Sequence, residues 1–299
     1  MDLRLEGKRA LVTGASKGIG KAIAISLAAE GCAVDIASRD EEALNCVATE
    51  IEAAIPGADV RVHAADLSVS ADQDALFEAC RDVDIVVNNA GAAATGSLLE
   101  TDEAGWRDSW DLKVFGYINL SRAFYGVMKD RTDGAIINII GYAGERLNSR
   151  YVIGTTGNAA LMAFTRSAGS ESPDFGVRIV GVNPSFTRTD RAEDQLKTFS
   201  KQQFGTEDRW RDVEREMNLP FGRMARVDEV ADMGTFLASV QSSRLMAEAP
   251  TEITDPLRSV MQHYLKTRLP LVQILGPQPN LPIHKPNLPG PVSKSPSRA

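Results

Sequence analysis

The sequence predicts an α/β protein built on a doubly wound parallel sheet with helices on both faces. Short apolar runs rich in Val and Ile alternate with longer amphipathic stretches over residues 1–240. The apolar runs lack the polar alternation of half-exposed strands, so each is expected to be buried on both faces. A glycine-rich turn at 13–20, TGASKGIG, joins the first apolar run to the first amphipathic one.

The predicted elements follow in order along the chain. Strands are predicted at 9–14, 32–39, 59–66, 83–91, 134–141 and 176–184. Helices are predicted at 18–31, 40–54, 70–81, 103–130 and 155–172, the fourth being long enough for two helices with a bend. The charged segment 188–224, which contains Trp210, is expected to form a lid over a site, because such long excursions are often functional. A solvated helical excursion is the alternative.

The composition changes at about residue 240. Eight of the fourteen prolines lie within 270–299, and basic residues outnumber acidic ones over 241–299. This segment is predicted to be an atypical, partly Pro-rich C-terminal tail whose end is extended or disordered. A shifted reading frame or a fusion is a further hypothesis for its origin. Residues 251–269 show some helical periodicity.

Charge and composition exclude several classes of function. The net charge of −7 disfavours nucleic-acid and anionic-membrane partners. No stretch approaches the roughly 18 apolar residues of a membrane span, and the N-terminus lacks a signal-peptide layout, so a cytoplasmic location is expected. Cys32, Cys46 and Cys80 are irregularly spaced and the three histidines lie far apart. Buried free thiols and no metal site are therefore predicted.

The turn at 13–20 predicts nucleotide binding. Its glycines allow a tight turn and the close approach of a pyrophosphate to backbone N–H groups. The amino end of the following helix adds positive potential.

Four motifs together resemble those of the classical short-chain dehydrogenase/reductase family. They are TGASKGIG at 13–20, DLS at 66–68, NNAG at 88–91 and NPSFTRT at 183–189. The last resembles a PGxxxT turn beside the nicotinamide, with Ser185 in place of the glycine. The resemblance covers about residues 6–239.

The resemblance implies a Rossmann-type dinucleotide-binding and catalytic domain over residues 1–240 that acts on a small-molecule substrate. It also implies a homo-oligomer formed through the long helices around 103–130 and 154–171. The cofactor contacts it implies are Gly14, Ser16, Lys17, Gly18, Ile19, Gly20, Ser38, Arg39, Asp66, Leu67, Asn89, Ala90, Gly91, Pro184 and Thr189.

The end of the second strand predicts NADP(H) in preference to NAD(H). An acid at that position would bind the adenosine ribose of NAD and repel a 2′-phosphate. Here the position is Ser38, followed by Arg39, and Lys17 lies in the phosphate turn. Two cations suit a 2′-phosphate. Asp40 would favour NAD(H) if it neutralised Arg39.

All four residues of the family's catalytic tetrad are replaced. In this family a tyrosine transfers the proton, a lysine four residues later lowers its pKa, a serine binds the substrate oxygen, and an asparagine on the preceding helix anchors a water. Alignment on the run NAAL places Gly154, Asn158, Gly141 and Lys113 at these positions, in the same order.

The asparagine and lysine positions have exchanged residue types. We hypothesise that Lys113 supplies the ammonium group from the opposite side, with Asn158 as its polar partner. A partly buried lysine has a lowered pKa and can act as acid, base or oxyanion stabiliser. Tyr151 and Tyr142 are the nearby candidate proton donors. The alternative for Lys113 is a side chain that extends to solvent.

The sequence therefore predicts an NADP(H)-dependent oxidoreductase that interconverts a carbonyl and an alcohol with an atypical active site. The alternative is an NADP(H)-binding pseudoenzyme or partner subunit, and a non-functional product is a third hypothesis. The family's seventh strand has no recognisable counterpart after residue 239. The sheet is expected to lack that edge strand, unless the periodic stretch at 251–269 covers the edge.

Overall fold

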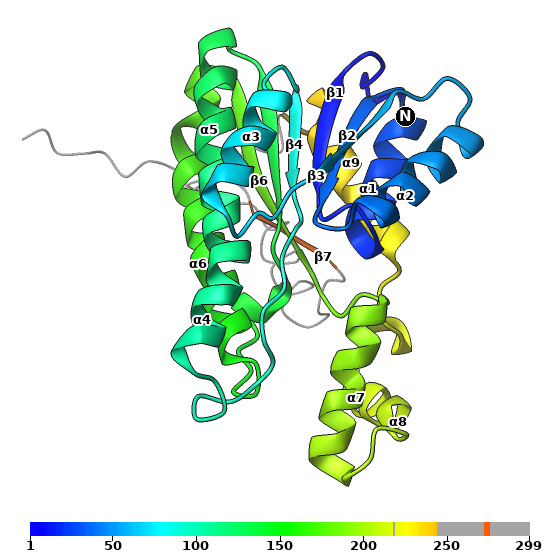
Figure 1. The fold of residues 1–299 in the computed structure, drawn as a ribbon, viewed down its shortest axis with the longest axis vertical. Helices are drawn as coiled ribbons and strands as arrows, with labels where there is room; N and C mark the ends of the chain where they lie inside the picture. Colours follow the sequence, from blue (N-terminus) through cyan, green and yellow to red (C-terminus); the bar gives the residue numbers. More distant parts are fainter. Residues whose placement is uncertain (218, 244–271, 276–299) are drawn as a thin grey trace, which may run out of the picture.

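The computed structural model describes residues 1–217, 219–243 and 272–275. Its centre is a seven-stranded sheet in the order β3-β2-β1-β4-β5-β6-β7 (Figure 1). The strands are β1 (Arg9–Thr13), β2 (Ala33–Ser38), β3 (Val60–Ala64), β4 (Ile85–Asn88), β5 (Gly134–Ile139), β6 (Val177–Pro184) and β7 (Val272–Leu275). The first six are parallel. The predicted doubly wound sheet is thus confirmed, with its order reversing between β1 and β4.

Helices cover both faces of the sheet (Figure 1). They are α1 (Gly18–Ala29), α2 (Glu41–Ala54), α3 (Ser70–Ala79), α4 (Glu103–Trp110), α5 (Gly116–Arg131), α6 (Val152–Glu171), α7 (Asp190–Phe204), α8 (Trp210–Glu216) and α9 (Val227–Ala238). One apolar core lies under α1, α2 and α9, and includes Ile23, Leu44 and Val230. The other lies under α3 and α5, and includes Leu76 and Phe124.

The long helical stretch predicted at 103–130 is interrupted by a π-helical turn. The turn, η1 (Asp111–Phe115), joins α4 to α5 and contains Lys113. A π-turn adds a residue to the helical repeat and is found frequently at functional sites. It sets the direction in which Lys113 leaves the helix.

The expectation of an uncovered sheet edge was wrong. The strand β7 pairs antiparallel with β6, over Gly181 to Pro184. Its four residues, VQIL, pair with the backbone of β6, which would otherwise be the exposed edge of the sheet. The predicted helical stretch 251–269 and the Pro-rich end 276–299 lie outside the described residues.

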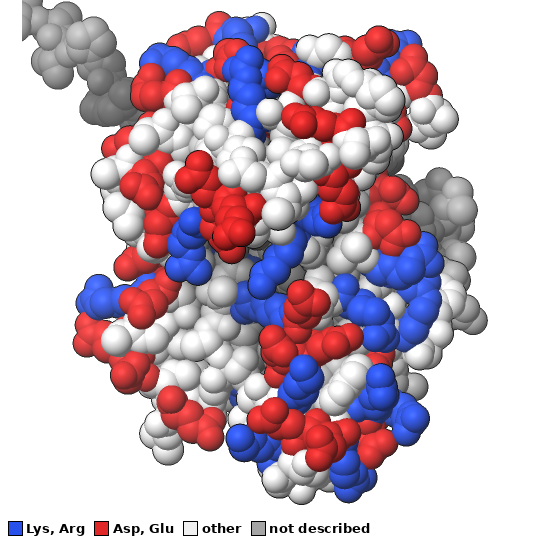
Figure 2. Space-filling view, turned by 45° about the vertical axis from the view of Figure 1, so that its right-hand side comes forward, with Lys and Arg blue, Asp and Glu red and all other residues white. Residues whose placement is uncertain are grey.

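The segment 188–224 forms a helical excursion that projects from the sheet (Figure 1). It has a small core of its own, formed by Leu196, Phe199, Val213 and Met224. Figure 2 shows dense charges of both signs over this part of the surface. We call residues 188–224 the lid.

Two further sequence expectations concern the cysteines and the membrane. Cys32 and Cys80 are buried as predicted, but Cys46 is exposed, so the prediction for it was wrong. It lies on the solvent side of α2, whose buried residues are Leu44, Val47, Ala48 and Ile51. Among the described helices none is long and apolar enough to cross a membrane.

Candidate active site

The turn between β1 and α1 is shaped for close contact with a ligand. Gly14 has a φ of +65°, and a Cβ built there would lie 2.8 Å from Ala90 Cα. A Cβ on Gly20 would overlap Asn89 Nδ2 and the Gly14 carbonyl oxygen. No side chain caps the amino end of α1, so its first N–H groups remain available to an anion.

Charged side chains of both signs lie around the end of β2. Asp40 does not neutralise Arg39, because its carboxylate caps α2 by accepting from Ala43 N at 3.0 Å. The nearest carboxylate to Arg39 is Asp66, at 3.8 Å from Nη1. A hydrogen bond from Ser68 lowers the pKa of Asp66. Lys17 is exposed and forms no salt bridge with a described residue.

The NNAG motif ties the phosphate turn to the sheet. Asn89 Nδ2 donates to the carbonyl oxygens of Thr13 and Gly14, at 3.0 and 3.2 Å. Asn89 N and Ala90 N both donate to Thr13 Oγ1, at 2.9 and 3.0 Å. These bonds fix the backbone of the phosphate turn at Thr13 and Gly14.

A cavity of about 470 Å³ lies between the carboxyl ends of the strands and the lid. It brings together eight of the predicted site residues, which come from widely separated parts of the chain. They are Ile19, Asn89, Gly91, Lys113, Tyr151, Asn158, Pro184 and Thr189. Ser16 and the glycines lie in the adjoining turn, and Ser38, Arg39 and Asp66 lie at neighbouring strand ends, with Leu67 buried under Gly116.

Lys113 enters this cavity from the π-turn. Its side chain passes over Gly91, where a Cβ would lie 2.9 Å from Lys113 Cγ. Its Nζ donates to the Ile140 carbonyl oxygen at 2.8 Å. Burial lowers the pKa of Lys113 to about 7, and the charge of Arg191 adds to the shift. The side chain therefore does not extend to bulk solvent, the alternative considered above.

Asn158 faces the same peptide from α6. Its Nδ2 lies 3.0 Å from a Cβ built on Gly141, and its buried Oδ1 has no hydrogen-bond partner among the residues that the structure describes. The Lys113 ammonium bonds to a backbone carbonyl and not to Asn158. The two side chains converge on the Ile140–Gly141 peptide, but their predicted direct pairing is absent from this structure.

The Tyr151 ring lies against Gly154, the glycine that alignment on the run NAAL places at the family's tyrosine position. A Cβ on Gly154 would overlap the Tyr151 ring and hydroxyl. Burial raises the pKa of Tyr151, and the nearby Arg191 opposes part of the shift. Tyr142 also lines the cavity, from the turn η2 (Tyr142–Gly144).

Arg191 lines the cavity, and the sequence offered it only as one of several possible contacts in the charged lid. It lies in the first turn of α7, and its Nη1 and Nη2 donate to the carbonyl oxygens of Gly91 and Ala93, at 2.9 and 3.1 Å. These bonds join the lid to the segment after β4. Nothing in the lid sequence distinguished this arginine from its neighbours.

A second cluster lies away from the cavity. Asp35 Oδ1 and Cys80 Sγ both contact His63 Nε2, at 2.7 and 3.5 Å. Burial raises the pKa of Cys80, so the thiol stays protonated near neutral pH. The 2.7 Å separation is that of a hydrogen bond.

A twisted parallel sheet with a phosphate turn at its first βα junction and a polar cavity at its strand ends defines a dinucleotide-binding enzyme of the Rossmann type. The model of the short chain dehydrogenase family matches residues 8–199. The chain belongs to this family of oxidoreductases.

Similar proteins cover most of the chain. It is 33% identical over 246 residues to galactitol 2-dehydrogenase (L-tagatose-forming) of Cereibacter sphaeroides. The match covers 80% of this chain and 91% of that relative. The structure of L-sorbose reductase from Gluconobacter frateurii with NADPH and L-sorbose superposes with a TM-score of 0.75 at 28% identity, covering 82% of this chain and 94% of that one. An NADPH-bound short chain oxidoreductase from Pseudomonas aeruginosa, described as containing an atypical catalytic center, gives a TM-score of 0.70 at 27% identity, covering 79% and 91%.

Proposed function

We propose that this chain is an NADP(H)-dependent oxidoreductase that interconverts a carbonyl and an alcohol, with Lys113 as the proton-transfer group. One observation carries the proposal. Lys113 Nζ lies in the cavity, 2.8 Å from the Ile140 carbonyl oxygen, and its pKa is lowered to about 7. A group with that pKa both gains and loses a proton near neutral pH, as a general acid or base must.

The residues at the dinucleotide site support NADP(H). Arg39 provides positive charge at the end of β2, where Ser38 stands at the position that a carboxylate would occupy to bind an NAD ribose, and Lys17 provides a second cation in the phosphate turn. Two solved relatives, the L-sorbose reductase and the Pseudomonas aeruginosa oxidoreductase, are described with NADPH. The reduced nicotinamide, when bound, supplies the hydride for the carbonyl carbon.

The protein must then supply the proton for the carbonyl oxygen. In this proposal the Lys113 ammonium donates it, and stabilises the developing negative charge beforehand. Tyr151, whose pKa is raised by burial, stays protonated and donates a hydrogen bond to the same oxygen. Asn158 is assigned a positioning role, because its amide lies beside Gly141, next to the Ile140 carbonyl that accepts from Lys113, with Nδ2 as the nearest amide atom.

The test begins with a fluorescence titration of the full chain with NADPH and then NADH. We expect saturable binding with NADPH preferred. NADPH oxidation is then followed with a panel of ketones and aldehydes, for the natural chain and for Lys113→Met. The proposal is supported if the natural chain turns over a substrate and the Lys113→Met variant does not, although that variant still binds NADPH. Binding without turnover on the whole panel would favour the pseudoenzyme alternative.

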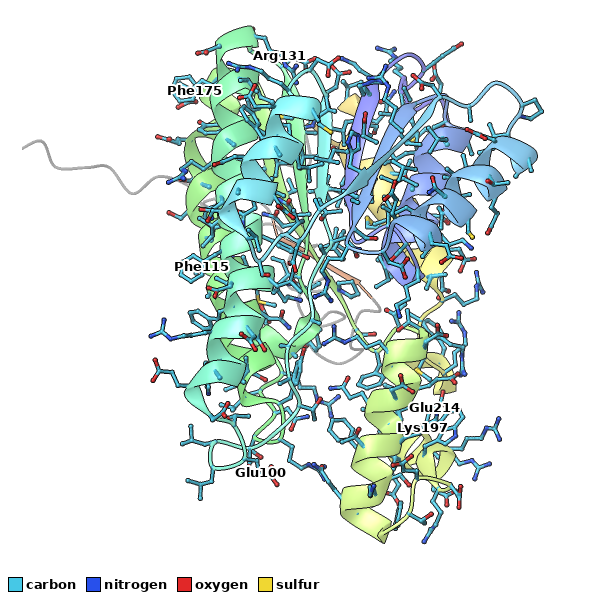
Figure 3. All side chains as sticks on the ribbon, viewed as in Figure 1. Glu100, Phe115, Arg131, Phe175, Lys197 and Glu214 are labelled. Carbon is cyan, nitrogen blue, oxygen red and sulfur yellow. The ribbon has the colours of Figure 1, made fainter. Side chains whose placement is uncertain are left out.

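We also infer a homo-oligomer formed through α5 and α6. Phe115 is 48% exposed at the π-turn before α5, and Figure 3 shows it pointing outward from that face. Light scattering after size exclusion tests this, and Phe115→Asp is expected to dissociate the assembly. A natural chain that elutes as a monomer would contradict it.

A further inference from the structure

We propose that the substrate carries a carboxylate, which Arg191 and Arg146 bind on the lid side of the cavity. This inference rests on the proposed function and specifies its substrate class. It predicts an oxo acid or hydroxy acid with an apolar portion, in place of a neutral polyol.

The first observation is the charge of the cavity wall. Three charged side chains line it, Lys113, Arg146 and Arg191, and all three are cationic. No Asp or Glu is among the lining residues in the part of the chain that the structure describes. The whole chain has a net charge of −7, so the charge of the cavity wall is opposite in sign to the net charge of the protein. Figure 2 shows Lys and Arg side chains in the hollow across the middle of the face it displays.

The second observation is how the neighbouring arginines are used. Arg188 pairs with Glu214, labelled on α8 in Figure 3, at 2.9 Å, and Arg166 pairs with Glu145 at 3.4 Å. Arg191 instead donates to two neutral carbonyl oxygens. Arg146 and Arg191 form no salt bridge with a carboxylate among the described residues. Within residues 1–217, 219–243 and 272–275, neither charge therefore has a carboxylate counter-ion.

The third observation is that like charges lie close together. The charge of Arg191 lowers the pKa of Lys113, which shows that the two cations repel across the cavity. An anion between them would relieve this repulsion. A guanidinium has five N–H donors in a planar fork, and two of the Arg191 nitrogens use only one bond each to carbonyls, so donors remain for a carboxylate.

The anion belongs to the substrate and not to the cofactor. The phosphate groups of the dinucleotide are accounted for by the turn at 13–20 and by Lys17 and Arg39. Arg191 lies beside Tyr151 and Lys113, the groups assigned to the reacting oxygen.

The remaining walls give the rest of the substrate. Phe186, Phe199, Met217 and Leu219 line the lid side, and Ile139 and Ile140 line the sheet side. These apolar side chains favour a hydrocarbon portion next to the carboxylate.

The test compares matched substrates and matched variants. A 3-oxo acid and its methyl ester are assayed with NADPH, using the natural chain, Arg191→Met, Arg146→Met and the control Lys201→Met. Lys201 lies on the same helix as Arg191 and contacts Glu207 at 3.3 Å, outside the cavity. Binding of a non-reducible carboxylate to the NADP⁺-loaded protein is measured by calorimetry as a second readout.

We expect kcat/KM for the acid to exceed that for the ester by about 10- to 100-fold. Arg191→Met should remove most of this preference through KM, Arg146→Met part of it, and Lys201→Met none. Equal rates on acid and ester, or a preference that survives in Arg191→Met, would overturn the carboxylate proposal and leave the oxidoreductase intact. No NADPH oxidation with either substrate, together with no carboxylate binding, would overturn both proposals.

Discussion

The ring of Tyr151 fills the space that a side chain at Gly154 would occupy. Tyr151 directly precedes α6 with a non-helical backbone, and Gly154 lies in the first turn of that helix. This relationship and the entry of Lys113 from the π-turn are the two features on which the proposed proton transfer depends.

Gly154→Ala is expected to displace the Tyr151 ring and to lower kcat strongly. The new Cβ would overlap the ring, so the ring must leave the cavity or the helix must shift. The control is Gly126→Ala on α5, where a Cβ meets nothing within 4 Å and alanine favours the helix. Circular dichroism establishes that both variants fold. Unchanged kinetics in Gly154→Ala would show that the position of Tyr151 is irrelevant to turnover.

Tyr151→Phe and Tyr142→Phe separate the two candidate phenols. The loss of a hydrogen bond to a charged transition state costs roughly 2–4 kcal/mol, so Tyr151→Phe should reduce kcat by about 10²- to 10³-fold. Tyr142→Phe should change it less than about threefold. The opposite ranking in steady-state assays would assign the hydrogen bond to Tyr142.

Lys17→Ala combined with Arg39→Ala should weaken NADPH binding by about 10- to 100-fold, because charge-assisted hydrogen bonds to the 2′-phosphate are lost. NADH binding should change little. Fluorescence titrations of both cofactors measure the ratio. Arg61→Ala is the control, since Arg61 faces Asp59 away from the turn. Equal losses for NADPH and NADH would contradict a role in binding the 2′-phosphate.

Lys113→Met should raise thermal stability while removing activity. The pKa of Lys113 is lowered from 10.5 to about 7 in the folded protein, so keeping the charge destabilises the fold. The sign follows from proton linkage. This destabilisation is complete below about pH 7, decreases as the pH rises, and is absent above about pH 10.5. The gain in Tm should therefore be larger at about pH 6 than at about pH 10.

Lys129→Met is the matched control for that measurement, because Lys129 is exposed and stacks on Phe175 at 3.5 Å, far along α5. Calorimetric scans of the three proteins at both pH values give the comparison. An equal Tm shift at the two pH values would show that the pKa of Lys113 is not lowered to about 7 in the folded protein.

The sheet and the phosphate turn could be predicted from the sequence, together with eight of the residues that line the cavity. Buried runs of Val and Ile predict parallel strands. The glycines of the turn form a recognisable motif, and the structure shows what they avoid: side chains there would clash with Gly14 itself or with Asn89 and Ala90 after β4. Lys113 and Asn158 were found because they replace specific positions in a known pattern.

Arg191, the Tyr151–Gly154 relationship and β7 could not be fully predicted. The lid contains many cations, and only the fold places Arg191 at the carbonyls of Gly91 and Ala93. The short strand β7 is specified by the edge it completes and carries no motif of its own. Asn158 was predicted as the polar partner of Lys113 from the exchanged residue types, whereas the Lys113 ammonium donates to the Ile140 carbonyl oxygen.

The central claim is that Lys113 moves the proton, and the pH dependence of kcat/KM for carbonyl reduction tests it most directly. The acid must be protonated, so the rate should fall as the pH rises through about 7, the pKa to which Lys113 is lowered. In the direction of alcohol oxidation it should rise over the same range. The residual activity of Lys113→Met should show no change of rate near pH 7 in either direction. A rate that is level between about pH 6 and pH 9, or a break that persists in Lys113→Met, would contradict the assignment.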